Sequence, residues 1–406
     1  MRFFYLYRSV SYKITCFKTK NLLIEYKPIW MLLHNNKAKR DMLKKTGQIV
    51  LAGVLGLLTL LPGGCAAPYS APPQVNAQAV QQETLEQKKL LYKRAEQDND
   101  RVARIAFPLM TANTAFCGRN VTAFDGLSGW TLDAFPPQEQ QMARQLFGLG
   151  AEVTLSQVVK GSPGDKAGLR KGDVLVSING VRLMTGRQGL KQASDLMKQA
   201  GLRPSQIHFM RGGQIANTTL TPVQSCAFSV YIDQKASNLN AYADGQNIVI
   251  SRGMMRFVES DTELALVIAH ELAHNAMAHV DKKKNNALTG ALGGLAIDAL
   301  LGAAGVSTGG QFGQAGMQAG ALSYSVAFEQ EADYIGMYFM ARAGFDTSNV
   351  ATFWRRMAVE QGNAAIQIRS THPTSPERFV AISRTHEEIQ SKKKRGQTLA
   401  PNMQKR

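Results

Sequence analysis

Two histidines and a glutamate between residues 261 and 274 have the types and the spacing that metal-assisted hydrolysis uses. Each residue of an α-helix advances about 100°, so His270 and His274 lie about 40° apart on one face, and both imidazoles can reach one ion. Glu271 points to the side of that axis, where it can hold a water beside the metal and take its proton. The pattern predicts a hydrolytic zinc site; the alternative is a pair of core histidines satisfied by backbone carbonyls.

A third protein ligand is required, because catalytic zinc keeps three and leaves one position for water. Residues 329 to 333 read Glu-Gln-Glu-Ala-Asp. Glu329 and Asp333 share one helix face, whereas Glu331 is turned about 200° from Glu329 and should face elsewhere. One of the first two can bind the ion, and Asp333 is free to accept a hydrogen bond from a ligand imidazole. A solvated acidic helix face is the alternative.

The helix that must position the histidines is predicted to be buried. Ser260 and Glu263 fit a capping box at its start, and the residues from 264 to 273 are apolar apart from His270 and Glu271. Imidazoles in such a helix must find partners or stay neutral. Ahead of it, Asn247–Ser251 reads as a strand. That strand is either the edge on which an extended peptide lies or part of a structural hairpin.

These motifs, with Asn240-Ala-Tyr-Ala and Ser370-Thr-His-Pro, occur within residues 226–390. This region resembles the zinc metallopeptidase family of the CAAX prenyl endopeptidases and HtpX-like proteases, and more closely its periplasmic lipoprotein members. The resemblance implies one Zn²⁺ per chain. The ligands and the general base that it implies are His270, His274, Glu329 and Glu271.

The last signature of that family contains His372 and Arg378. Both are expected to stabilise the oxyanion of the tetrahedral intermediate, since a cation or N–H donor placed there acts as charge develops. In some family members the corresponding histidine blocks the open metal position. The alternative is a histidine that fixes a Pro-bearing turn ahead of a helix.

A second module is expected at residues 146–223. It resembles a PDZ domain of the bacterial protease type in Ala167-Gly-Leu-Arg-Lys-Gly-Asp-Val-Leu and Ile178-Asn-Gly. The resemblance implies that a loop binds the C-terminal carboxylate of a peptide, which then adds as a strand beside a helix. The residues expected in that loop are Phe147, Gly148, Leu149 and Gly150. A rigid spacer or a cover for the active site is the alternative.

Cys117 and Cys226 lie on either side of this module. An even pair of thiols in an oxidising compartment is more often bonded than free, so we predict a disulfide. Two free buried cysteines are the alternative.

The N-terminal region has the features of an export signal. Residues 1–64 hold 11 Lys and Arg against 2 Asp and Glu, about half of the basic excess of the chain. Residues 42–64 combine a basic start with a short apolar run, as a secretory signal does, and the small residues before Cys65 resemble a bacterial lipobox. We therefore expect translation to start at Met42 after a non-translated or unstructured extension, 1–41, and Cys65 to be lipidated.

The fold class expected is α+β: a mainly helical, gluzincin-type metallopeptidase domain with a small sheet, plus an inserted β-rich PDZ domain. The remaining divisions are a Pro- and Ala-rich tether at 65–78, an N-terminal helical region at 79–145, the peptidase at 224–390 and a basic disordered tail at 391–406. The Gly- and Ala-rich segment 288–323 is given no role. His279, His208 and His386 are interpreted as surface or packing residues.

These features predict a zinc endopeptidase of the bacterial envelope that degrades misfolded or misassembled envelope proteins. Its expected partners are protein or peptide substrates and, through the lipid anchor, the outer membrane; no nucleic acid is expected. The alternative is a chaperone-like or scaffold lipoprotein that acts through its PDZ domain. The oligomeric state is left open.

Overall fold

The computed structural model describes residues 73–303, 306–322, 325–360, 362, 372 and 375–403. The expected extension, signal peptide, Cys65 and the start of the tether lie outside the described residues. The fold below belongs to the compact unit that contains Glu83–Arg406. Among the helices of the described ranges, none combines the length and the apolar character that crossing a bilayer would need.

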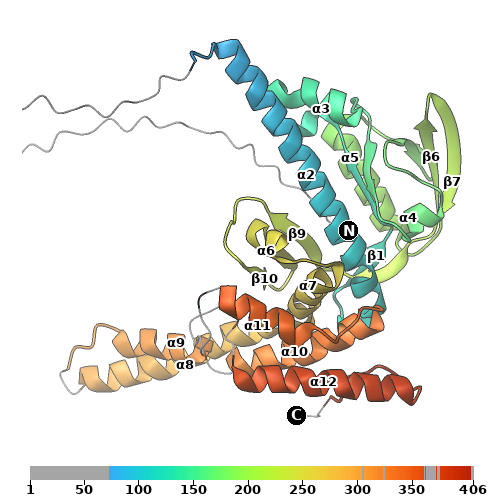
Figure 1. Ribbon diagram of the computed structural model, residues 1–406. Helices are drawn as coiled ribbons and strands as arrows, with labels where there is room; N and C mark the ends of the chain where they lie inside the picture. The colour runs from blue at the N-terminus through green and yellow to red at the C-terminus, as the bar shows by residue number, and fades with distance from the viewer. Residues whose placement is uncertain are drawn as a thin grey trace, which may run out of the picture. The chain divides into compact units, whose positions relative to one another are not determined.

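The predicted fold class is confirmed: the chain is mostly helical, with small sheets (Figure 1). It begins with the long helix α2, Ala77–Ala112. Val102, Ile105 and Leu109 recur at helical spacing on its second half and are at most 3% exposed. They join the peptidase core, whereas Tyr92 belongs to a separate aromatic cluster. Packing is thus the role of this helix, as its apolar spacing predicts.

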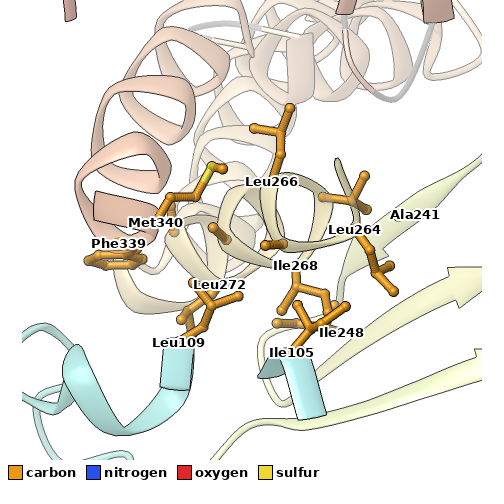
Figure 2. Packing of buried hydrophobic residues seen from close by; sticks show 14 of the residues in the cluster. Ile105, Leu109, Ala241, Ile248, Leu264, Leu266, Ile268, Leu272, Phe339 and Met340 are labelled. Atoms are coloured by element: carbon orange, nitrogen blue, oxygen red, sulfur yellow. The ribbon is translucent and has the colours of Figure 1, made fainter. Parts of the chain in front are cut away.

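The peptidase module is built around α7, Asp261–Ala276. The Ser260 hydroxyl accepts the Glu263 N–H at 3.2 Å, and the Glu263 carboxylate accepts the Glu259 N–H at 2.7 Å, so the helix start is capped on both sides. Every residue from Leu264 to Asn275 is buried. Figure 2 shows apolar side chains of α7 among those of α2, β11 and α10. Each fully buried Leu or Ile side chain contributes about 1.5–3 kcal/mol.

The same module contains nine further elements among its described residues. They are β9 (Ser229–Asp233), β10 (Ala241–Ala243), β11 (Asn247–Ser251), α6 (Arg252–Phe257), α8 (His279–Ala303), α9 (Gln311–Leu322), α10 (Ser325–Arg342), α11 (Val350–Glu360) and α12 (Pro376–Lys394). In the three-stranded sheet, β11 lies between β10 and β9. Of the two alternatives for Asn247–Ser251, the structure supports the structural hairpin, because β11 pairs antiparallel with β10 and parallel with β9; β10 is an edge strand of this sheet.

The second module contains a five-strand path in the order β2-β3-β4-β6-β7, with β5 paired to β4. Its strands are β2 (Leu127–Trp130), β3 (Thr154–Val158), β4 (Val174–Ile178), β5 (Val181–Arg182), β6 (Ser205–Arg211) and β7 (Gln214–Leu220); its helices are α4 (Pro163–Lys166) and α5 (Gly186–Ala200). The predicted start at residue 146 is too late, because β2 pairs with β3. Residues 79–145 are therefore not purely helical.

A two-stranded ribbon joins the ends of this module to the peptidase core. It pairs β1 (Val121–Phe124) with β8 (Val223–Cys226) in antiparallel register. Cys117 and Cys226 form the predicted disulfide, with Cα atoms 5.7 Å apart, and both are 3% exposed. The bond therefore fixes the ribbon where it enters the core.

The C-terminal segment 391–403 is ordered, which corrects the expected disordered tail. Helix α12 continues to Lys394. The Lys392 ammonium lies 4.9 Å from the centre of the Tyr338 ring and donates to the Ala400 carbonyl at 2.7 Å, while Arg342 donates to the Leu399 carbonyl at 3.2 Å. The basic run is thus used for contacts, because a lysine stem can lie on an apolar surface while its ammonium stays polar.

Candidate metal centre

Two helices bring the predicted ligands together. His270 and His274 lie on α7, and Glu329 lies on α10; their exposed fractions are 0%, 5% and 0%. The helices approach closely at Gly336, where an added Cβ would come within 3.2 Å of the Ala269 backbone and of the His270 Cα. A glycine at this crossing allows a carboxylate from α10 to reach the imidazoles of α7.

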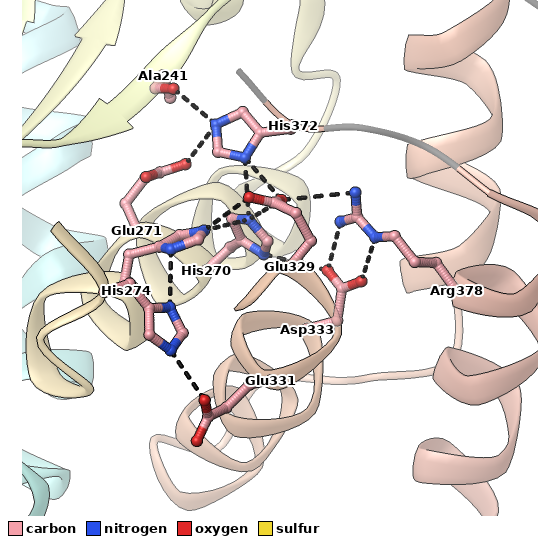
Figure 3. A network of polar contacts seen from close by, with 10 residues as sticks. Ala241, His270, Glu271, His274, Glu329, Glu331, Asp333, His372 and Arg378 are labelled. Atoms are coloured by element: carbon pink, nitrogen blue, oxygen red, sulfur yellow. Dashed lines mark hydrogen bonds and ion pairs between the residues drawn. The ribbon is translucent and has the colours of Figure 1, made fainter. Parts of the chain in front are cut away.

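The donor atoms have the spacing that a tetrahedral ion requires (Figure 3). The two Nε2 atoms of His270 and His274 are 3.1 Å apart, and each lies 3.3 Å from an oxygen of Glu329. The Nδ1 of His372 lies 3.3 Å from His270 Nε2 and 2.9 Å from Glu329 Oε2. Zinc bonds of about 2.0–2.1 Å at the tetrahedral angle place ligand atoms about 3.3 Å apart. The four residues therefore fit zinc.

Protonation of the cluster is governed by its carboxylates. Burial alone would lower the pKa of His270, but Asp333 and Glu329 raise it to about 10. Burial would raise the pKa of Glu329, yet the surrounding imidazoles hold it well below the ordinary value. In the metal-free protein His270 is therefore charged at neutral pH, and a metal ion must displace its proton in order to bind.

Glu271 lies beside the cluster, as predicted. It is 2% exposed, and its Oε1 is 3.4 Å from His372 Nε2. Within the described part of the chain, its Oε2 has no hydrogen-bond partner. A buried carboxylate oxygen without a partner is costly. One that borders a metal centre is suited to bind water and to accept a proton.

Asp333 lies beside His270 and is itself held by Arg378. His270 Nδ1 is 3.1 Å from Asp333 Oδ1, an ion-pair distance without hydrogen-bond geometry, and the Nε2 atom of His270 faces the donor cluster. The Arg378 guanidinium donates to both Asp333 oxygens, at 2.8 and 3.0 Å, and is 2% exposed. Arg378 Nη1 also lies 3.5 Å from Glu329 Oε2, so in this structure Arg378 contacts these two carboxylates, and its oxyanion role stays a prediction.

His372 lies at the donor cluster, where it could either stabilise the oxyanion or block the open metal position. Its Nδ1 lies among the donor atoms, and its Nε2 lies 3.1 Å from the Ala241 carbonyl of β10. In this conformation His372 can serve as a fourth ligand. The neighbouring residues of its signature, 370, 371, 373 and 374, lie outside the described residues.

Two residues of the centre were missed by sequence reasoning. His279 is fully buried, and its Nδ1 lies 3.0 Å from His274 Nδ1. Its Nε2 lies 3.0 Å from Glu331 Oε2, so Glu331, which is not one of the donors, reaches the centre only through His279. The sequence signal that could have indicated His279 is its position three residues after the end of α7, the helix that carries the two histidine ligands.

The predicted peptide-binding loop is not at a sheet edge. Phe147 ends α3 (Gln140–Phe147) and packs against Trp130 with ring centres 4.9 Å apart; Leu149 is 2% exposed. Strand β3, which follows Phe147, Gly148, Leu149 and Gly150, is paired on both sides. The edge strands of this sheet path are β2 and β7, and β2 is the one beside β3. A groove of about 440 Å³ lies there, lined by residues that include Leu127, Gly129, Leu190, Met197, Lys198 and Ile207.

Comparison with known proteins gives the same two modules. Residues 210–386 match Peptidase family M48, and residues 154–204 match a PDZ domain. Mitochondrial metalloendopeptidase OMA1 of Schizosaccharomyces pombe is 33% identical over 152 residues, which are 37% of this chain and 44% of that protein. The beta-barrel assembly-enhancing protease of Escherichia coli O157:H7 is 33% identical over 158 residues, 36% of this chain and 32% of that protein.

A solved structure of the HtrA3 PDZ domain bound to a phage-derived ligand aligns with 26% of this chain and 88% of that chain, at 17% identity and a TM-score of 0.20. The chain thus spans less than half the length of the two curated relatives.

Proposed function

We propose that this protein is a zinc-dependent endopeptidase of the bacterial envelope, because residues 210–386 match Peptidase family M48 and hold a buried group of donors suited to zinc. The observation that carries the proposal is the buried convergence of His270, His274 and Glu329 beside Glu271. Misfolded or misassembled envelope proteins are the proposed substrates. The likeness to a beta-barrel assembly-enhancing protease supports this choice.

Each residue of the centre has a defined part in peptide hydrolysis. When bound, zinc polarises the scissile carbonyl and acidifies a water molecule. His270, His274 and Glu329 would hold the ion. Glu271 accepts the proton of the attacking water at its carboxylate and passes it to the leaving amine. The burial of these four residues keeps bulk water from competing for the same groups.

The edge strand β10 supports a way to bind an extended substrate. Its residue Ala241 contacts His372 through its carbonyl, so the strand borders the donor cluster. Tyr242 on the same strand is 42% exposed. A substrate that adds to β10 would be held by backbone hydrogen bonds, which are independent of its side chains. We therefore propose broad specificity.

The groove beside β2 is the proposed second peptide site. The edge strand β2 and the helix α5 border this groove, which is the arrangement in which a peptide adds to a sheet as a further strand. The lining is largely apolar, and its charged members are Arg187, Lys191, Lys198 and Asp125. A protein or peptide substrate would bind there before it reaches the metal centre.

The position of His372 supports the hypothesis that the activity of this enzyme is regulated. Catalytic zinc needs an open position, whereas a site closed by four protein ligands is typical of structural zinc. His372 Nδ1 stands where the fourth ligand belongs. We propose that His372 must leave for cleavage to occur. In that case His372→Ala raises a low basal activity, and an unchanged or lower activity would refute this regulation.

The proposed anchor at Cys65 and the location at the outer membrane rest on the sequence of residues 42–65. Metabolic labelling with a palmitate analogue tests the anchor. Label should be present in the wild type and absent from Cys65→Ala.

The decisive experiment combines metal analysis with casein digestion. The wild type should contain about one zinc per chain and lose activity with a chelator. Glu271→Gln should retain zinc and lose activity by at least 10²-fold, the range for a removed general base. The exposed Glu360 at the end of α11 offers a matched control, Glu360→Gln, which should behave as wild type. A cellular phenotype that survives Glu271→Gln would favour the scaffold alternative.

A further inference from the structure

We propose that His279 and Glu331 are positioning residues that hold the metal ligand His274 in the tautomer and ring orientation required for zinc binding. This inference deepens the proposed function and rests on it. It concerns neither the ligands nor the general base but a chain of contacts behind one ligand. The chain runs from His274 to His279 and from there to Glu331.

The conformation of the segment between α7 and α8 brings His279 behind His274. Helix α7 ends at Ala276, and Ala278 has φ 54°, a conformation that residues other than glycine rarely adopt. The chain thereby turns, and His279 begins α8 with its ring buried. The ring stacks on Phe328 with centres 4.6 Å apart and planes 15° apart. This stacking fixes the plane of the imidazole.

The direction of the hydrogen bonds follows from the chemistry of the three groups. An ionised carboxylate can only accept, so the 3.0 Å contact with Glu331 requires the proton of His279 on Nε2. In neutral His279, Nδ1 is then an acceptor. His274 must donate its Nδ1–H across the 3.0 Å contact between the two Nδ1 atoms. Its Nε2 keeps a lone pair, and this is the atom that faces Glu329 at 3.3 Å.

The two contacts of the His279 ring agree with its neutral form: Nδ1 faces Nδ1 of His274, and Nε2 faces a carboxylate oxygen of Glu331. A protonated His279 would present N–H groups on both sides and could not accept from His274.

Both histidine ligands then have a carboxylate behind them, by two different routes. His270 contacts Asp333 directly at 3.1 Å. His274 reaches Glu331 through the intervening imidazole. The Glu331 side chain is 31% exposed, whereas that of Asp333 is 5% exposed, so the support of His274 extends to the surface. Outer partners of metal-binding histidines typically change metal affinity by 10- to 100-fold when they are replaced.

The test compares two replacements of His279 that separate hydrogen bonding from packing. His279→Phe keeps an aromatic ring against Phe328 but removes both nitrogens. His279→Gln loses the ring but retains an amide that can accept from His274 and donate to Glu331. A positioning role predicts that zinc dissociation constants rise about 10- to 100-fold in His279→Phe and clearly less in His279→Gln. A packing role predicts the opposite order.

Zinc affinity is measured by competition with a chromophoric chelator on the full chain, and the cobalt-substituted protein reports ligand geometry through its visible spectrum. Glu331→Gln and Glu331→Leu provide a second pair at a partly exposed position, where folding is less at risk. Leucine should weaken zinc binding about tenfold or more, and glutamine less. His386→Phe is the matched control, since His386 contacts Thr347 at 2.8 Å and should bind zinc as the wild type does.

Wild-type affinity in both His279→Phe and Glu331→Leu, or tighter binding by His279→Phe than by His279→Gln, would overturn the inference. If His279→Phe does not fold, the Glu331 pair alone decides. A wild-type protein that binds no zinc would instead refute the proposed function. The two failures are therefore distinguishable without any activity assay.

Discussion

The clamp that Arg378 forms on Asp333 provides a quantitative prediction. The side chains are 2% and 5% exposed, and two charge-assisted hydrogen bonds of 2.8 and 3.0 Å join them. Arg378→Met keeps much of the buried volume but leaves the Asp333 carboxylate without its cation. Removal of one partner of a buried ion pair costs about 3–5 kcal/mol, because an uncompensated charge remains in a medium of low polarity.

The loss should depend on Asp333. In Arg378→Met/Asp333→Asn both charges are absent, so the double replacement should cost less than the two single costs added together. A coupling free energy of about 2–3 kcal/mol is expected for groups in direct contact. Arg384, an exposed residue of the same helix, gives the control Arg384→Met, whose effect should stay within about 0.5 kcal/mol.

Denaturant unfolding of zinc-stripped protein measures these free energies. Trp354 reports on the correct region, because its ring centre lies 5.0 Å from that of His270 and 5.7 Å from the Arg378 guanidinium carbon. Replacing Trp30 and Trp130 by phenylalanine leaves Trp354 as the only tryptophan of the chain. Unfolding of the other module then contributes little to the signal.

Two results would refute the reasoning. One is a destabilisation by Arg378→Met below about 1 kcal/mol together with no coupling to Asp333. The other is unchanged stability and unchanged zinc affinity combined with a large loss of turnover. That second outcome would support the oxyanion role that the sequence motif suggests, since a group acting on the transition state changes turnover alone.

Three further predictions concern the ribbon, the helix crossing and the protons of the centre. Replacement of Cys117 and Cys226 by alanine should cost about 4.8 kcal/mol on the chain-entropy scale, given a separation of 109 residues, and denaturant unfolding measures it. Gly336→Val should push α10 from α7 and reduce casein cleavage about 10²-fold. The control Gly293→Ala, with nothing within 4 Å of the added carbon, should leave cleavage unchanged. In the zinc-free protein, the pKa of His270 is raised from 6.5 to about 10, so protonation of His270 stabilises the fold, and this stabilisation is complete below pH 6.5. It is lost as the pH rises toward about 10. The thermal unfolding temperature of the wild type should therefore fall over that interval, while that of His270→Gln does not.

Much of the centre could be predicted from local spacing. His270 and His274 share a face by helical periodicity alone, as do Glu329 and Asp333, and the disulfide followed from the number of cysteines. The contacts that the sequence did not predict depend on the conformation of connecting segments. The spacing within α10 correctly separates Glu331 from Glu329, but it gives no sign of the contact with His279, which depends on the turn between α7 and α8.

The second module shows a different limit. Strand β2 is four residues long, contains a glycine and shows no alternation of buried and exposed residues, so its sequence carries no strand signal. It exists because its backbone pairs with β3. Pairing between strands distant in sequence decides which strand is the edge. Because β2 is an edge strand, the groove lies beside β2 and not at the predicted loop that begins at Phe147. The peptide-binding prediction was therefore correct in type of module only.

The charges of the centre explain why a divalent cation suits it. Glu271, Glu329 and Asp333 are buried together, with Arg378 as the permanent cation among them. Without metal, protons must supply the missing positive charge; accordingly the pKa of His270 is raised to about 10, and the pKa of His372, which burial would lower, is raised by Glu329 and Glu271. Zinc supplies the same two charges at once while the imidazoles return to the neutral form that binds metal. The buried carboxylates are thus compensated in both states, so the fold can hold the site assembled before the ion arrives.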